Sequence, residues 1–138
     1  MASPYPHIAC CLDQSEASGR ALAEARRLRA FGAGRLSLVH VLESPIPGTM
    51  LPEAVAALTE TPEGSLRWLG ELAAAGDYEY PVVLDQQFPP KAVCEWAARV
   101  GPDLIVAAAV RKPGQRLLHG AFAGYLAYHA PCAVLLVH

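Results

Sequence analysis

Short, unbroken apolar runs constrain the fold of this 138-residue chain more than any other feature. A run of this length without polar alternation is typical of a strand that is buried on both faces, as in a parallel sheet covered by helices. A further run alternates and contains Pro81, which predicts a strand at the edge of the sheet. The runs are 7–12 (HIACCL), 35–41 (RLSLVHV), 103–110 (DLIVAAAV) and 132–137 (CAVLLV), with 78–84 (YEYPVVL) as the edge strand.

Helical segments separate these runs. Either Ser15 or Ser18 can cap the first helix, and Thr61 followed by Pro62 predicts the start of a later one. We expect helices from Ser15 or Ser18 through Leu28, over 51–60, from Thr61 through Ala73, from Pro89 through Val100, and over 120–129. Strand–helix alternation with short loops predicts an α/β fold, a single domain over residues 1–138 with a doubly wound, five-stranded parallel sheet.

Charge and composition exclude several functions. The net charge of −2 provides neither a basic face for nucleic acid nor a polybasic patch for a membrane surface. Residues 117–138 contain no charged side chain and are long enough to span a bilayer, but Pro131 divides them into a helical and a strand-like half. We therefore expect no membrane or nucleic-acid partner.

The N-terminal segment and the cysteines indicate the compartment. The sequence MASPYPHIACCLDQ has no basic region followed by a long apolar run, so no signal peptide is predicted. Cys10, Cys11, Cys94 and Cys132 form no C-x-x-C pair and are expected to be reduced thiols. These observations favour a cytoplasmic protein.

Ligands on parallel sheets bind beyond the carboxyl ends of the strands, where the strand order reverses. The candidate positions are therefore Asp13, Val41 and the segment from Ala108 to Gly120. No Ser–His–Asp order near G-x-S-x-G, no Walker loop and no H-E-x-x-H motif is present. No His, Cys, Asp or Glu pair has metal-ligand spacing, so neither a catalytic set nor a metal site is expected.

In the order and spacing of its motifs, nearly the whole chain resembles the universal stress protein family. The opening strand is followed by an Asp and by S-x-x-S-x-x-A-L, and the chain ends in an H-A-P-C strand. The matching residues are Asp13, Ser15, Ser18, Ala21, Leu22, His40-Val41, Pro89 with Val93, 103–106 and 129–137. The resemblance implies strand order 3-2-1-4-5 in a Rossmann-like three-layer sandwich of the adenine-nucleotide alpha hydrolase-like group.

The resemblance also implies a homodimer joined through the last strand. The sequence favours the same arrangement independently, because 132–137 is apolar and ends the chain, so a symmetric copy would protect its free edge. Some members of the family bind ATP, with the fourth strand running into G-x-x-G, nine residues and then G-S or G-T. An adenine nucleotide is therefore the ligand to test, although the sequence establishes no cofactor.

The phosphate loop departs from that pattern. Ala108 and Arg111 stand at the first two glycine positions, and only residues 112–119 separate Arg111 from Gly120. Ala121 replaces the hydroxyl residue, while Gly114 survives inside the turn. Two interpretations remain open. In one, the basic side chains of Arg111 and its neighbours Lys112 and Arg116 hold a phosphate in place of backbone amides. In the other, they are solvated turn residues.

Asp13 and Val41 carry the rest of the candidate site. Asp13 could accept hydrogen bonds from a ribose, as the resemblance implies, or it could cap the first helix. Val41 could present its backbone to an adenine edge or be plain strand core. We predict a homodimeric universal stress protein that is a binding module with a degenerate nucleotide site and no efficient catalysis. The alternative is a genuine ATP- or AMP-binding switch with slow hydrolysis, and an unidentified protein partner also stays open.

Overall fold

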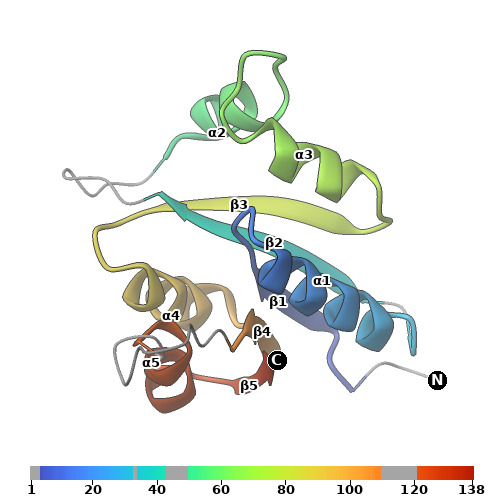
Figure 1. The fold of residues 1–138 in the computed structure, drawn as a ribbon, viewed down its shortest axis with the longest axis vertical. Coiled ribbons are helices and arrows are strands. Elements are labelled where there is room, and N and C mark those ends of the chain that lie inside the picture. Colours follow the sequence, from blue (N-terminus) through green and yellow to red (C-terminus); the bar gives the residue numbers. More distant parts are fainter. Residues whose placement is uncertain (1–3, 33, 43–49, 110–120) are drawn as a thin grey trace.

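The computed structural model describes residues 4–32, 34–42, 50–109 and 121–138. They form a five-stranded, fully parallel sheet in the order β3-β2-β1-β4-β5 (Figure 1). This confirms the predicted fold class and strand order. The strands are β1 (His7–Cys11), β2 (Arg35–Leu42), β3 (Glu79–Asp85), β4 (Leu104–Ala108) and β5 (Ala133–Val137). The helices are α1 (Glu16–Arg29), α2 (Pro52–Thr59), α3 (Arg67–Ala74), α4 (Pro89–Val100) and α5 (Ala121–His129).

Helices cover both faces of the sheet. Helices α1 and α3 cover one face, and α4 and α5 cover the other (Figure 1). The first core contains Ile8 and Val106, and the second contains Ala9 and Ile105. Every residue of β1 is buried, because its alternate side chains enter one core or the other. This two-sided burial is the physical reason why the central strands read as unbroken apolar runs.

Local signals explain where most elements begin and end. The Ser15 hydroxyl accepts a hydrogen bond from the Ser18 N–H at 3.1 Å, so Ser15 is the cap of α1. Helix α4 starts at Pro89 and ends at Val100, where Gly101 caps it with a φ of 76°, the left-handed conformation that glycine adopts freely. Strand β3 contains Pro81 and lies at the sheet edge, as predicted.

The prediction that Thr61 and Pro62 begin a helix is wrong, because α3 starts at Arg67. The Thr61 hydroxyl instead donates to the Ala57 carbonyl at 2.6 Å, so it completes the end of α2. The Leu66 N–H then donates to the Leu58 carbonyl at 3.0 Å and turns the chain back. A hydroxyl beside a proline fits either role by sequence, and the close packing of α2 on α3 decides between them.

Charged and polar side chains close the amino-terminal end of the sheet. The Glu79 carboxylate, 1% exposed, accepts hydrogen bonds from Arg26 at 2.7 and 3.0 Å, and Arg29 lies 3.9 Å away. The Arg26 guanidinium also donates to the Leu72 carbonyl at 2.8 Å, which ties α1 to α3 and β3. Gly76 leaves the room for this carboxylate, because a Cβ there would collide with it.

A second polar group at the same end surrounds His7. Arg35 donates to His7 Nδ1 at 3.0 Å, so the ring is the neutral tautomer whose Nε2–H donates to the Ser37 hydroxyl at 2.8 Å. The Asp103 carboxylate accepts from the His7 backbone N–H at 2.8 Å. These bonds satisfy the polar groups that burial removes from water. Within the described residues, no helix is long and apolar enough to cross a membrane.

Candidate functional site

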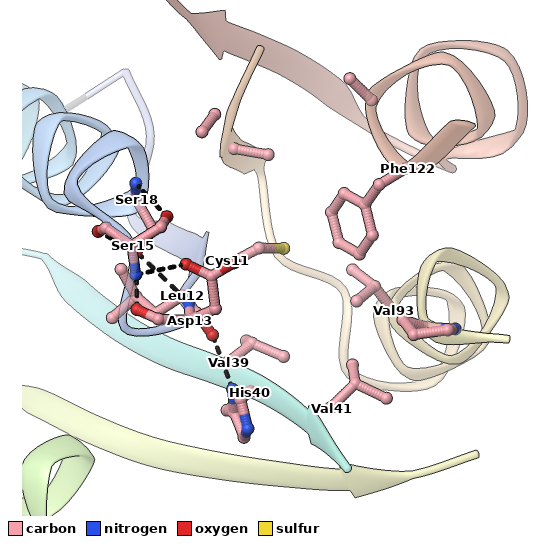
Figure 2. Close-up of a pocket in the computed structure, with 14 residues that line it drawn as sticks. Cys11, Leu12, Asp13, Ser15, Ser18, Val39, His40, Val41, Val93 and Phe122 are labelled. Atoms are coloured by element: carbon pink, nitrogen blue, oxygen red, sulfur yellow. Dashed lines mark hydrogen bonds between the residues drawn. The ribbon is translucent and has the colours of Figure 1, made fainter. Parts of the chain in front are cut away.

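A cavity of about 310 Å³ opens at the carboxyl ends of β1, β2 and β4. Figure 2 shows its two sides: Asp13, Ser15 and Ser18 gather in the turn from β1 to α1, and Phe122 and Val93 face them from α5 and α4. The strand order reverses between β1 and β4, so this is the position at which α/β sheets bind ligands. The other lining residues are Cys11, Leu12, Val39, His40, Val41, Pro89, Ala107, Ala108 and Ala123.

The structure brings together three of the residues that the sequence singled out. Asp13, Val41 and Ala108 all line this cavity, although they follow or end three different strands. Ala121 is exposed at the start of α5 and does not line the cavity, whereas its neighbours Phe122 and Ala123 do. The candidates Arg111, Gly114 and Gly120 lie outside the described residues, as do Lys112 and Arg116.

Hydrogen bonds hold the β1–α1 turn, which we define as residues 12–18. The Asp13 carboxylate accepts from the Ser15 N–H at 2.8 Å, which fixes the start of the helix. The Leu12 N–H donates to the Val39 carbonyl at 2.8 Å, and the Leu12 carbonyl accepts from His40 Nδ1 at 2.7 Å (Figure 2). The turn is therefore tied to β2 immediately before Asp13.

Asp13 supplies a negative charge to the cavity. Burial alone would raise its pKa, but hydrogen bonds from Ser15 and Ser18 and the field of His40 outweigh burial, so the pKa of the Asp13 carboxyl is lowered. The carboxylate is therefore ionised near neutral pH and acts as a hydrogen-bond acceptor. Its Oδ1 atom accepts from the Ser15 N–H, and the two oxygens of a carboxylate have lone pairs for further hydrogen bonds. Asp13 thus both supports the turn that precedes α1 and retains an acceptor for a ligand.

The strands beneath the cavity and the helices opposite the turn are apolar. Val39 and Val41 from β2 and Val93 from α4 contribute branched side chains, and Phe122 contributes an aromatic ring. Burial raises the pKa of the Cys11 thiol well above its usual value, so Cys11 is a neutral, unreactive part of this wall. One polar and one apolar side suit a flat, ring-containing ligand with hydrogen-bonding groups along one edge.

Sequence reasoning missed several lining residues. Cys11 and Val39 share one face of the sheet with the predicted Val41, so strand alternation could have placed them in the site once the strand order was known. Phe122 and Val93 carry no such signal, because they lie on α5 and α4, whose packing against each other is a tertiary feature. Within the described ranges, no group of three His, Cys, Asp or Glu residues could hold a metal ion.

A helix-covered parallel sheet with a cavity at its switch point defines the class of this protein as a doubly wound α/β domain. The model of the universal stress protein family matches residues 4–138, and the chain belongs to that family. No curated protein sequence matches this chain significantly.

Solved structures with the same fold carry the same family name. A universal stress protein family member from Burkholderia pseudomallei is 28% identical, with a TM-score of 0.68 over 99% of this chain and 98% of that one. A universal stress protein in complex with cAMP is 22% identical, with a TM-score of 0.73 over 99% of both chains. The protein from Archaeoglobus fulgidus in complex with dAMP is 19% identical, with a TM-score of 0.65 over 99% of both chains.

Proposed function

We propose that this protein is a non-catalytic binding module that recognises the nucleoside part of an adenine nucleotide in the cavity beside Asp13. The observation that carries this proposal is the meeting of Asp13, Val41 and Ala108 in one cavity at the switch point. Its volume of about 310 Å³ lies at the lower end of the range for small-molecule sites, about 300–1,000 Å³. The cAMP and dAMP complexes of structural relatives support an adenine ligand.

Each part of a nucleoside has a counterpart in this cavity. The free acceptor of the ionised Asp13 carboxylate suits the hydroxyl groups of a ribose. The apolar side, with Val93 and the Phe122 ring, suits the faces of a purine. The backbone of Val41, near the end of β2, is available to the polar edge of the base.

The phosphate side is the degenerate part of the site. No lysine or arginine is among the described residues that line the cavity, and Asp13 adds a negative charge that repels phosphates. The sequence replaces loop glycines by Ala108 and Arg111 and the usual hydroxyl residue by Ala121. We therefore infer that the phosphates add little to affinity.

The same residues argue against efficient hydrolysis. Asp13 is the one carboxylate among the described cavity residues. Phosphoryl transfer depends on residues that hold a metal ion, orient the nucleophile and stabilise the equatorial oxygens. A single carboxylate, bonded into its own turn, cannot fill these roles.

Calorimetric titration with adenosine, AMP and ATP–Mg²⁺ tests the proposal. We expect binding at or below about 100 μM, corresponding to about −5.5 kcal/mol, and affinities for adenosine and ATP within about fivefold. The variant Asp13→Ala should weaken all three ligands. Absence of heat with a folded protein would contradict the proposal.

The alternative is a nucleotide switch in which Arg111 and its basic neighbours hold the phosphates. It predicts that ATP binds about 100-fold more tightly than adenosine, because charge-assisted phosphate contacts are strong. It also predicts slow release of inorganic phosphate. Arg111→Ala would separate the two cases, since it should weaken only ATP in the switch and neither ligand in our proposal.

We further propose that two copies pair through β5. The Val137 carbonyl accepts from the Ala109 N–H, so alternation directs the N–H groups of Val134 and Leu136 to the free edge. On the opposite edge, Tyr78 and Gln86 bond to β2, which directs Pro81 outward where it cannot donate. The apolar side chains of β5 are half-exposed in the single chain. The β3 edge therefore disfavours pairing with another strand, whereas the β5 edge is available for it.

Sedimentation of edge variants tests this dimer. Val134→Pro removes an outward N–H without removing a hydrogen bond to β4, so we expect a folded monomer. Val134→Thr keeps the N–H and the branched shape and should stay dimeric. A monomeric wild-type protein would contradict the proposal.

A further inference from the structure

Ser18 differs from the other polar residues of the cavity because its side chain is used entirely within the protein. It is 5% exposed, and its hydroxyl donates to the Asp13 carbonyl at 2.7 Å, with the Ser15 carbonyl at 3.1 Å as a second acceptor. The same oxygen accepts from the Asp13 N–H at 3.3 Å. One side chain therefore holds both backbone polar groups of the residue that we propose as the ligand's acceptor.

Leu12 and Ser18 are buried at the two ends of the turn, whereas Asp13 and Ser15 between them are exposed, so packing does not hold these two residues. Leu12, Asp13, Ser15 and Ser18 line the cavity of about 310 Å³. The same residues also line a groove of about 420 Å³ between α1 and α3, whose far side includes Trp68. Close packing fixes buried side chains, and the exposed Asp13 and Ser15, which lie between two hollows, lack it. Hydrogen bonds within the turn must therefore fix the position of the Asp13 carboxylate.

We propose that Ser18 is a positioning residue that sets the direction of the Asp13 carboxylate toward the ribose of the ligand. This inference rests on the proposed function. The Ser15 N–H holds the turn at Asp13 Oδ1, and the His40 ring holds it at the Leu12 carbonyl. Among the residues that the structure describes, only Ser18 holds the backbone of Asp13 on both sides of its Cα (Figure 2). Loss of the Ser18 hydroxyl leaves the partly buried N–H and carbonyl of Asp13 without this partner, and the turn shifts to provide new ones.

The test compares AMP with its 2′,3′-dideoxy analogue in calorimetric titrations of Ser18→Ala. In the wild-type protein, we expect AMP to bind about tenfold more tightly than the analogue, because only AMP offers hydroxyl groups to the Asp13 carboxylate. In Ser18→Ala, this ratio should fall to about twofold or less, while binding of the analogue stays nearly unchanged. A structural defect alone would weaken both ligands together.

Ser37→Ala is the matched control. Ser37 is also buried, at 4% exposure, and its hydroxyl bonds to His7 at the opposite end of the sheet. Its loss should lower stability by an amount similar to the loss of Ser18 and leave the AMP preference at its wild-type ratio. An unchanged ratio in Ser18→Ala, or an equal fall in both variants, would overturn the positioning role.

If the wild-type protein binds neither ligand, the proposed function is refuted. A second measurement then tests the positioning role of Ser18 without a ligand. The Asp13 carboxyl can be titrated by carbon NMR in the ligand-free protein. A shift of the turn would weaken the hydrogen bond from the Ser15 N–H to the Asp13 carboxylate, so Ser18→Ala should raise the pKa of Asp13 and Ser37→Ala should not. An Asp13 pKa that is the same in Ser18→Ala and in the wild-type protein would overturn the positioning role on its own.

Discussion

The two ends of the sheet use polar side chains in opposite ways. At the amino-terminal end, Glu79 is 1% exposed and is bonded to Arg26, and His7 is bonded to Arg35 and Ser37. At the carboxyl end, Asp13 and its serines border a cavity whose other side is apolar. Polar groups at the first end satisfy one another, whereas Asp13 at the second end retains an acceptor. The paired polar groups stabilise the amino-terminal end of the sheet, whereas the cavity at the carboxyl end has room for a ligand.

Removing the Glu79 charge should have the largest effect. Glu79→Gln leaves Arg26 and Arg29 without their buried partner, and we expect a loss of about 3 kcal/mol in the free energy of unfolding, at the lower end for a broken buried ion pair because Arg26 is partly exposed. Urea denaturation measures this loss. The control is Glu71→Gln, which breaks an exposed pair with Arg67 and should cost less than about 1 kcal/mol. Equal effects in both variants would show that the amino-terminal end is not specially stabilised.

Two large-to-small substitutions on α5 compare packed core with cavity wall. Leu126 is fully buried, so Leu126→Ala should destabilise the protein by about 3 kcal/mol. Phe122 is half-buried and already borders a hollow, so Phe122→Ala should cost only about 1 kcal/mol, roughly half of what full burial of such a side chain contributes. Thermal and urea unfolding of both variants provide the values. A larger loss for Phe122→Ala would mean that the cavity wall is packed like the core.

His7 should give the protein a pH-dependent stability with a smaller effect. Burial first, and then the Arg35 charge, lower the pKa of His7, while Asp103 opposes them. The unfolded chain therefore takes up a proton at a higher pH than the folded one. The contribution of neutral His7 to the free energy of unfolding is fully present above about pH 6.5. It is lost as the pH decreases toward the folded-state pKa, by up to about 1.4 kcal/mol per pH unit. Urea midpoints between pH 7.5 and about 5.5 measure the slope, and His7→Gln should flatten it. An equal slope in both proteins would contradict the assignment.

The sequence predicts the fold closely because a strand that is buried on both faces appears in the sequence as an unbroken apolar run. The apolar run from Leu104 to Ala108 needs no partner to be identified as a central strand, and Pro81 identifies an edge. The start of α3 could not be predicted, because Thr61 and Pro62 resemble the start of a helix. In the structure, the Thr61 hydroxyl donates to the Ala57 carbonyl instead, and α3 begins at Arg67. The packing of α2 on α3 outweighs the local preference of Thr61 and Pro62 for a helix start.

The site is predictable only in part for a similar reason. Asp13 and Val41 follow from the rule that ligands bind at the carboxyl ends of parallel strands. Ser18 was only one of two equivalent capping candidates in the sequence, and its bonds to the Asp13 backbone depend on how the turn folds. The ion pair of Glu79 and Arg26 joins residues 53 positions apart, so no local sequence pattern predicts it.

The most direct test of the account measures stability and AMP affinity together in Asp13→Asn and Glu79→Gln. Asp13→Asn should weaken AMP binding about tenfold and change the free energy of unfolding by less than about 1 kcal/mol. Glu79→Gln should lower the free energy of unfolding by about 3 kcal/mol and leave AMP affinity unchanged in the folded protein. Loss of AMP affinity in Glu79→Gln, or unaltered affinity in Asp13→Asn, would contradict the division of the sheet into a stabilising end and a binding end.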